Sequence, residues 1–365
     1  MKQVDLIYRT AYAELVQRSL DASFDADFPA TGNFVSVPVK GRKYWYFEDS
    51  HTVPKRRYVG PADDAEINRR VTEFKRGKDG FRGRRKLVST LTREAGLGAP
   101  ERFTGDIIAA LQRNGLFRLR AVLVGTVAFQ AYSAHLGVRL PSASLQTGDA
   151  DFAQFHSVSA EVGDSLPPIL DILRQVDDTF RPVPHMNDGQ QSTQFINSQS
   201  YKIEFLTPNR GSADHDGEPS RMPALGGAAA QPLRFLDFLI YQPVYAVLLH
   251  GGGIPVLVPA PERFAVHKLI VSTRRRDDPN GFAKREKDLH QASLLVDAMA
   301  ETRRLSDLAE AYMEAWERGD HWQSALTGGL NGLGAARAGQ VTAALRAGLE
   351  ELGEESDRYF RSPHS

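Results

Sequence analysis

The first hundred residues combine a helical apolar pattern with short alternating stretches. Apolar residues recur at helical spacing over roughly residues 1–20, and two alternating runs around Lys40-Gly41-Arg42 predict a β-hairpin. A third strand is expected near residues 55–61, and residues 63–97 are polar with a helical character. We therefore expect residues 1–100 to form an N-terminal helix plus a basic β-hairpin appendage.

From residue 101 the pattern alternates between helices and strands. It predicts helices at residues 107–116, 126–136 and 168–176, and strands at residues 121–124, 148–152, 193–197 and 201–206. A stretch rich in Gly, Ala, Pro and Asp at residues 208–231 predicts a long loop, and residues 235–258 indicate a buried, β-rich continuation. Together these elements predict a central domain over residues 101–260.

The remaining residues, 261–365, have helical periodicity and predict a C-terminal helical domain. Its helices are expected at residues 263–272, 284–302, 305–318 and 335–352. With the strand-rich middle and the hairpin in front, the fold class is α+β.

Composition and charge set limits on this outline. The 365 residues exceed the usual size of one domain, and 45 basic residues balance 45 acidic ones, so net charge indicates no partner. The chain has no cysteine, which excludes disulfides, thiolate metal sites and cysteine nucleophiles. The N-terminus lacks a signal-peptide pattern, and the most apolar stretch is interrupted by Asp237 and Pro243. We expect a cytoplasmic protein with no membrane contact.

Three carboxylates form the strongest chemical pattern. Asp149 and Asp151 are two positions apart in a predicted strand, so both side chains leave the same face. Glu204 lies in another predicted strand and adds a third carboxylate. Clustered anions are costly unless a cation joins them, and Mg²⁺ takes a few carboxylates together with substrate phosphates. Isolated histidines without metal-site spacing are instead expected to be hydrogen-bonded structural residues: His156, His185 and His267.

These parts occur in a recognisable order along the chain. A strand followed by Gly125-Thr126 and a helix precedes the Asp-x-Asp strand, and the strand with Glu204 comes last. This order resembles the polymerase-β-like nucleotidyltransferase superfamily, although Thr126 replaces the commoner Gly or Ser and the spacer to Asp149 is long. The chain also resembles a bacterial nucleotidyltransferase-fold family of largely unassigned substrate, through residues 261–269, 274–276 and 284–289. The resemblance implies a mixed sheet with flanking helices, an N-terminal basic hairpin-containing domain and a C-terminal helical domain.

The resemblance also implies a role for each residue of the motif. Gly125 would let the backbone approach a nucleoside triphosphate (NTP), and Thr126 begins a helix whose amide end favours phosphate. Asp149 and Asp151 would hold Mg²⁺, or Mn²⁺, ions that bridge the phosphates. Glu204 would bind the catalytic metal and help deprotonate the acceptor hydroxyl.

Two basic residues after the central domain are further candidates for nucleotide binding. Lys268 and Arg274 lie on a predicted helix and its end, from which a cation would reach the β- and γ-phosphates. The alternative is a solvated helix face on which these side chains pair with nearby acidic residues.

The region between Lys40 and Lys86 is strongly basic. It contains fifteen Lys or Arg residues and seven Asp or Glu residues, an excess of eight positive charges that suits a phosphate backbone. Tyr44, Trp45 and Tyr46 lie among these charges and could stack on bases. The alternative is that the aromatic residues form a small hairpin core while the charges are solvated.

The sequence thus predicts a Mg²⁺-dependent nucleotidyltransferase. It would transfer a nucleoside monophosphate (NMP) from an NTP to an acceptor hydroxyl and release pyrophosphate. The basic region favours an RNA acceptor such as tRNA, with a protein or small molecule as alternatives. A different class of function is a catalytically silent nucleotide- or nucleic-acid-binding module, such as a toxin–antitoxin component. Retention of all three carboxylates argues against the silent module.

Overall fold

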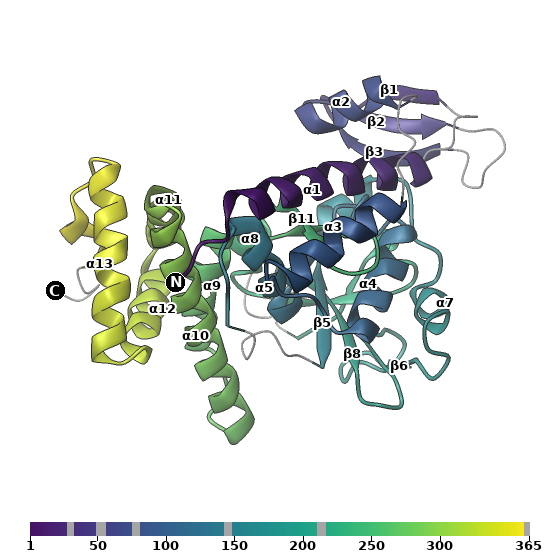
Figure 1. Cartoon of the computed structure of the whole chain (residues 1–365). Coiled ribbons are helices and arrows are strands. Elements are labelled where there is room, and N and C mark those ends of the chain that lie inside the picture. Colours follow the sequence, from purple (N-terminus) through teal and green to yellow (C-terminus); the bar gives the residue numbers. More distant parts are fainter. Residues whose placement is uncertain (28–32, 49–55, 75–80, 142–147, 210–216, 361–365) are drawn as a thin grey trace.

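The computed structural model describes residues 1–27, 33–48, 56–74, 81–141, 148–209 and 217–360. Figure 1 shows a mixed sheet with its helices next to a group of C-terminal helices, with a small three-stranded sheet above α1. The α+β class expected from the sequence is confirmed. No helix among the described residues is long and apolar enough to cross a membrane.

The N-terminal part contains the predicted helix and hairpin. Strands β1 and β2 pair in antiparallel register around Lys40 and Gly41, and β3 pairs with β2 on its other side. The third strand is therefore confirmed as well. The elements are α1 (Leu6–Asp27), β1 (Asn33–Val39), β2 (Arg42–Glu48), β3 (Arg56–Pro61), α2 (Ala65–Glu73) and α3 (Phe81–Arg93).

Helix α1 packs on the central part of the molecule instead of on the hairpin. It lies against α3 and against the strand pair β11 (Val244–Leu248) and β12 (Ile254–Val258). The Tyr12 hydroxyl accepts a hydrogen bond from the backbone N–H of Val247 at 3.0 Å, and Leu15 is fully buried. The domain boundaries expected at residues 100 and 260 stay predictions. Helix α1 belongs to the first hundred residues of the sequence, but it packs on strands of the central part.

The central sheet has the strand order β4-β5-β8-β10-β9. Strand β7 also pairs with β8, and β6 pairs with β7. Strands β5, β8 and β10 run parallel, while β4 is antiparallel to β5. The elements are α4 (Arg102–Arg113), β4 (Val122–Val124), α5 (Gly125–Leu136), β5 (Asp149–Ala153), α6 (His156–Glu161), α7 (Ile169–Arg174), β6 (Arg181–Val183), β7 (Gln194–Ile196), β8 (Lys202–Pro208), β9 (Ser220–Arg221) and β10 (Ala229–Leu233).

Two expectations for the central region are wrong in part. The stretch 208–231 is not all loop, because residues 229–233 form β10, which pairs in parallel with β8. Small residues and a proline hide the apolar alternation of this strand. The stretch 235–258 also begins with a short helix, α8 (Leu236–Leu239), before the separate two-stranded sheet of β11 (Val244–Leu248) and β12 (Ile254–Val258).

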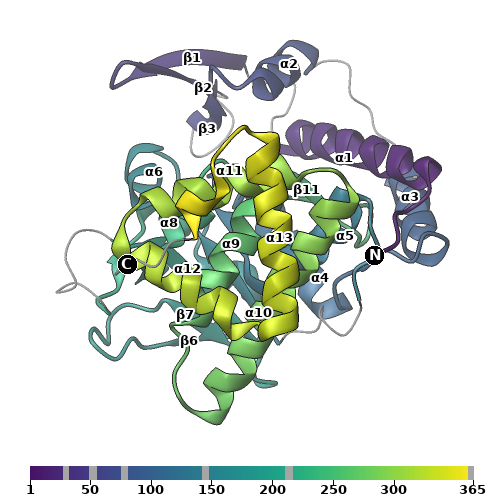
Figure 2. The same cartoon turned by 90° about the vertical axis from the view of Figure 1, so that its left-hand side faces the viewer.

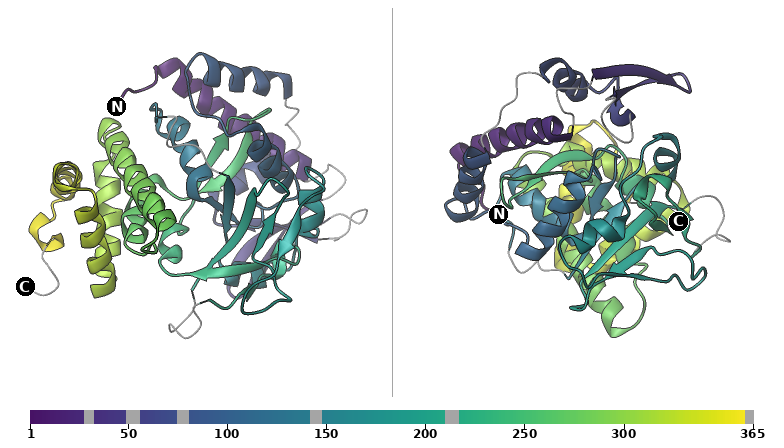
Figure 3. Two further views of the ribbon diagram at one scale, coloured as in Figure 1. Left: turned by 90° about the horizontal axis from the view of Figure 1, so that it is seen from below. Right: turned by 90° about the vertical axis from the view of Figure 1, so that its right-hand side faces the viewer.

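The C-terminal part is helical, as expected, and lies beside the sheet (Figures 2 and 3). One helix was missed, because Gly328, Gly329 and Gly332 lower the helix propensity of its sequence. Gly329 packs so closely on α9 that a Cβ atom there would lie 2.3 Å from the carbonyl oxygen of Leu269. The elements are α9 (Pro261–Ser272), α10 (Pro279–Glu301), α11 (Leu305–Glu317), the missed α12 (Asp320–Gly332) and α13 (Ala335–Glu351).

Candidate active site

Strand register brings the three carboxylates together. In the parallel pairing of β5 with β8, Asp151 lies directly opposite Glu204, and Asp149 lies two positions earlier on the same face. In the antiparallel pairing with β4, Val124 lies opposite Asp151. Helix α5 begins at the next residue, so the Gly-Thr step of the motif starts beside the same carboxylates.

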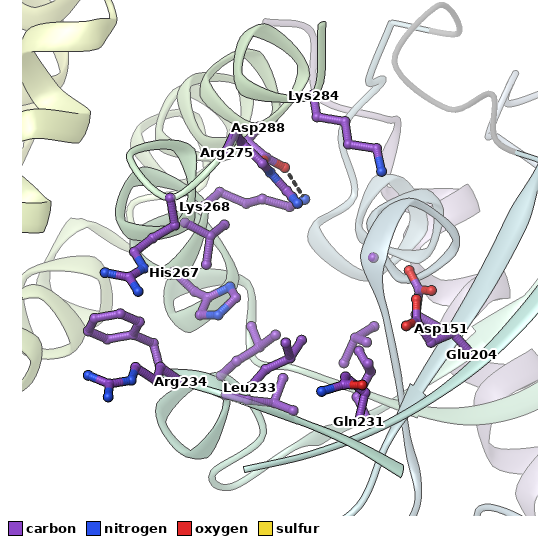
Figure 4. Close-up of a pocket in the computed structure, with 18 of the residues that line it drawn as sticks. Asp151, Glu204, Gln231, Leu233, Arg234, His267, Lys268, Arg275, Lys284 and Asp288 are labelled. Carbon is purple, nitrogen blue, oxygen red and sulfur yellow. Dashed lines mark hydrogen bonds and ion pairs between the residues drawn. The ribbon is translucent and has the colours of Figure 1, made fainter. Parts of the chain in front are cut away.

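A cleft of about 650 Å³ lies over this face of the sheet. Its floor comes from β5, β8 and β10, and its opposite wall comes from α9 and α10 (Figure 4). The structure places all seven residues predicted for the site on its lining: Gly125, Thr126, Asp149, Asp151, Glu204, Lys268 and Arg274. Their individual roles stay predictions.

The carboxylates are held in an unfavourable electrostatic environment. Burial, together with the neighbouring charges of Asp149 and Glu204, raises the pKa of Asp151 to about 8, although Lys268 and Lys284 oppose the shift. Burial also raises the pKa of Glu204, against a hydrogen bond of 2.9 Å that its Oε1 accepts from the Gln194 amide. The cluster therefore favours either a proton or an added cation.

The basic wall faces the carboxylates from two helices. Figure 4 shows Lys268 and Lys284 reaching into the cleft on the side opposite Asp151 and Glu204. Lys284 is exposed and Lys287 is half-buried, and burial lowers the pKa of Lys287. The two lysines Lys284 and Lys287 belong to a motif quoted from the sequence, but nothing in the linear pattern indicated that α10 turns them toward the strands.

Lys268 is paired instead of solvated. Its ammonium group donates to one oxygen of Asp288, and Arg275 Nε donates to the other at 2.7 Å. Asp288 is 2% exposed, and although burial alone would raise its pKa, the two cations hold the pKa below its usual value. Lys268 therefore has an acidic partner, but it is 8% exposed and does not lie on the solvated helix face of the alternative, and its role in nucleotide binding stays a prediction.

The far end of the cleft is less polar. Leu233 ends β10 and Phe235 follows it, and the guanidinium carbon of Arg274 lies 5.9 Å from the ring centre of Phe235. His267 also lines this part, and burial lowers its pKa to about 3, so its imidazole is neutral at physiological pH.

The donor set suits a hard divalent cation that shares its ligands with a substrate. Within the described residues, no group of three or more His, Asp or Glu side chains is arranged to hold a metal ion by itself. Mg²⁺ commonly binds through one or two carboxylates together with phosphate oxygens. Asp149, Asp151 and Glu204 fit that mode, because all three line the cleft, and burial together with the two neighbouring carboxylates raises the pKa of Asp151, which an added cation would offset.

The basic appendage packs at the other end of the sheet from this cleft. It is anchored by Asp164, which accepts hydrogen bonds from the backbone N–H of Tyr58 at 3.2 Å and from Arg118 at 2.6 Å. Arg118 precedes the start of β4 and Asp164 follows the end of β5, whereas the motif residues lie where β4 ends and β5 begins.

Two of the aromatic residues in the appendage are structural. Trp45 packs in the small core between the three-stranded sheet and α2, and its indole N–H donates to Asn68 at 2.7 Å. Tyr46 is buried in the main core. This arrangement agrees with the alternative of a hairpin core, in which Tyr46 is buried and Trp45 is partly buried. Four of the fifteen basic residues lie outside the described residues: Lys55, Lys75, Arg76 and Lys78.

The fold and the cleft define an α+β protein with a mixed sheet, in which clustered strand carboxylates face basic helices. The sequence model of a family described as Nucleotidyltransferase matches residues 102–317, which cover the sheet and helices α9 to α11. The chain belongs to this nucleotidyltransferase family. No curated protein and no solved structure matches it.

Proposed function

We propose that this protein is a Mg²⁺-dependent nucleotidyltransferase that moves an NMP from an NTP to an acceptor hydroxyl. The proposal rests on one observation: Asp151 and Glu204 lie opposite each other on neighbouring strands, across the cleft from the lysines of α9 and α10. Such a cleft offers ligands for a phosphate-bound cation on one side and positive charge for the phosphate tail on the other.

The proposed reaction is an in-line displacement at the α-phosphate. The acceptor oxygen forms a bond to the α-phosphorus, and the bond from that phosphorus to the oxygen bridging the β-phosphate breaks. Pyrophosphate leaves with the electron pair, and the hydroxyl proton passes to a carboxylate, for which Glu204 is our candidate. The raised pKa of Glu204 suits a group that accepts a proton during the reaction. Bound Mg²⁺ would supply charge stabilisation for the phosphates.

We propose RNA as the first acceptor to test, in a cytoplasmic setting where NTPs are available. The support is the excess of positive charge over residues 40–86. Because the appendage lies at the opposite end of the sheet from the cleft, an acceptor that contacts both has to be large. A folded RNA meets this requirement better than a small molecule does.

The test is a transfer assay with Mg²⁺ or Mn²⁺. Each of the four α-labelled NTPs is incubated with the protein and either total cellular RNA or a protein lysate. We expect label to appear in the RNA fraction and to vanish in the Asp149→Ala/Asp151→Ala variant. Label in the protein fraction alone would show that the acceptor is a protein and not RNA, while the proposed transfer reaction would still hold. If no NTP supports transfer although nucleotide binds tightly, the enzyme assignment fails and the silent binding module takes its place.

A further inference from the structure

Gln231 extends the floor of the cleft beyond the carboxylates. In the parallel pairing of β10 with β8, Gln231 lies opposite Leu206, which is two positions after Glu204. The three side chains therefore share one face of the sheet. In Figure 4 the amide group of Gln231 lies between Leu233 and the carboxylates of Asp151 and Glu204, with its nitrogen on the side of Leu233.

A histidine outside the cleft fixes the direction of this amide. His185 Nδ1 accepts a hydrogen bond of 3.2 Å from the backbone N–H of Asn187, so the proton of the neutral ring is on Nε2. Nε2 lies 2.8 Å from Oε1 of Gln231 and donates to it. The amide oxygen is thereby occupied. The amide nitrogen has no hydrogen-bond partner within the described residues, so it offers its donors to the cleft.

The loop that carries His185 is itself tied to the rim of the cleft. The backbone N–H of His185 donates to the carbonyl of Gln191 at 2.9 Å. The side-chain amide of Asn187 donates to the carbonyl of Gly217 at 2.9 Å, and Gly217 lines the cleft. The histidine is thus held at a defined position behind Gln231, as expected for a hydrogen-bonded structural residue.

The course of the nucleotide along the cleft follows from the positions of charge. If the α-phosphate lies at the carboxylates, the β- and γ-phosphates extend toward the basic wall of α9 and α10. The nucleoside then extends along the remaining floor, past Gln231 to Leu233 and Phe235. Ribose is the first group after the α-phosphate, and its hydroxyls are the acceptors nearest to a donor at Gln231. Leu233, which is 42% exposed, offers an apolar surface further on, where the base would lie.

We propose that Gln231 binds a ribose hydroxyl of the NTP through its amide nitrogen, and that His185 is the positioning residue that keeps this nitrogen turned toward the cleft. The inference rests on the proposed function and adds the part of the substrate that β10 recognises. It predicts that the protein distinguishes ribonucleotides from analogues that lack one hydroxyl.

The test compares binding of each ribonucleoside triphosphate with its 2′-deoxy and 3′-deoxy analogues, with Mg²⁺ and without acceptor, by calorimetry. The wild-type protein should bind the ribonucleotide about 2- to 10-fold more tightly than one of the two analogues, as expected for one hydrogen bond. Gln231→Leu should weaken ribonucleotide binding by a similar factor and reduce that ratio to about 1. His185→Phe should also lower the ratio, because the amide is then free to rotate.

Matched variants separate recognition from folding. Gln231→Glu keeps the shape of the side chain but cannot donate when ionised, so it should lose the discrimination as well. Gln175→Leu, at an exposed position after α7, should keep the wild-type ratio. The inference about Gln231 is overturned if the wild type binds all analogues equally. It is also overturned if the ratio of ribonucleotide to deoxy-analogue affinity is unchanged in Gln231→Leu and Gln231→Glu. Neither outcome would affect the proposed function. Failure of every NTP to bind would instead overturn the proposed function.

Discussion

The carboxylate of Asp151 occupies the space that a side chain on Gly125 would need. A Cβ atom at Gly125 would lie 2.5 Å from Oδ2 of Asp151, and the backbone of Gly125 has a φ of +69°. The Gly-Thr step and the Asp-x-Asp strand are therefore two parts of one packing arrangement across β4 and β5. The family resemblance implies that this glycine lets the backbone come close to a triphosphate. The structure shows a second reason for a glycine here, because the carboxylate of Asp151 packs against it.

Gly125→Ala should reduce transfer activity by about 100-fold, the scale expected when reacting groups are displaced by about 1 Å. The new methyl group displaces the carboxylate of Asp151, and a non-glycine residue at this φ adds about 1–2 kcal/mol of strain. Gly339→Ala in α13 is the matched control, since a Cβ there meets nothing within 4 Å. Steady-state kinetics and thermal unfolding check both variants, and a fully active Gly125→Ala would contradict the packing argument.

Asp151→Asn should make the metal-free protein more stable at pH 8, by about 2 kcal/mol after allowance for the partial exposure of the group. The pKa of Asp151 is raised from the ordinary 3.8 to about 8, so wild-type stability falls as the pH rises from about 4 to 8. The variant should lack this fall, and also the stabilisation by Mg²⁺ and NTP. Unfolding curves across this pH window measure the difference, with the exposed Asp178→Asn as the control. Parallel curves for wild type and Asp151→Asn would disprove the argument.

Lys284→Ala should raise the KM for the NTP by about 10-fold, since one charge-assisted contact to the phosphate tail is lost. The effect should shrink at high salt, because Lys284 is exposed and its field is screened. Arg285→Gln is the matched control on the same helix, because Arg285 pairs with Asp277 at 3.2 Å and does not line the cleft. An unchanged KM in Lys284→Ala would remove this lysine from the phosphate site.

Asp288→Asn should destabilise the protein by about 3–5 kcal/mol, since it leaves the buried charge of Lys268 and the partly exposed charge of Arg275 without their shared partner. The pKa of Asp288 is held below its ordinary value, so its contribution is present above about pH 4 and is lost as the pH falls further. Denaturant titrations at pH 7 and pH 3 measure this loss. The exposed Glu286→Gln on the same helix should change stability little. A small effect of Asp288→Asn at pH 7 would show that the cluster is not held by this carboxylate.

Local patterns were sufficient where neighbours in sequence decide the structure. The hairpin of β1 and β2, helix α5 after Gly125 and the strand with Asp149 and Asp151 all follow from apolar periodicity and turn residues. Local patterns failed where a contact with a distant element compensates for a weak local preference for strand or helix. Strand β10 forms because β8 pairs with it, and α12 tolerates its glycines because Gly329 lets it approach α9 closely.

The sequence by itself determined the carboxylates of the site, their two-residue spacing and the Gly-Thr step before them, because these depend on residue type and on the alternation of a strand. Only the tertiary structure decided what faces them. Helix packing turns Lys284 into the cleft, Asp288 holds Lys268 at its wall, and His185 orients Gln231 across 46 residues of sequence. Each of these contacts joins residues that no local pattern relates, so it becomes visible only when the sheet and the helices are assembled.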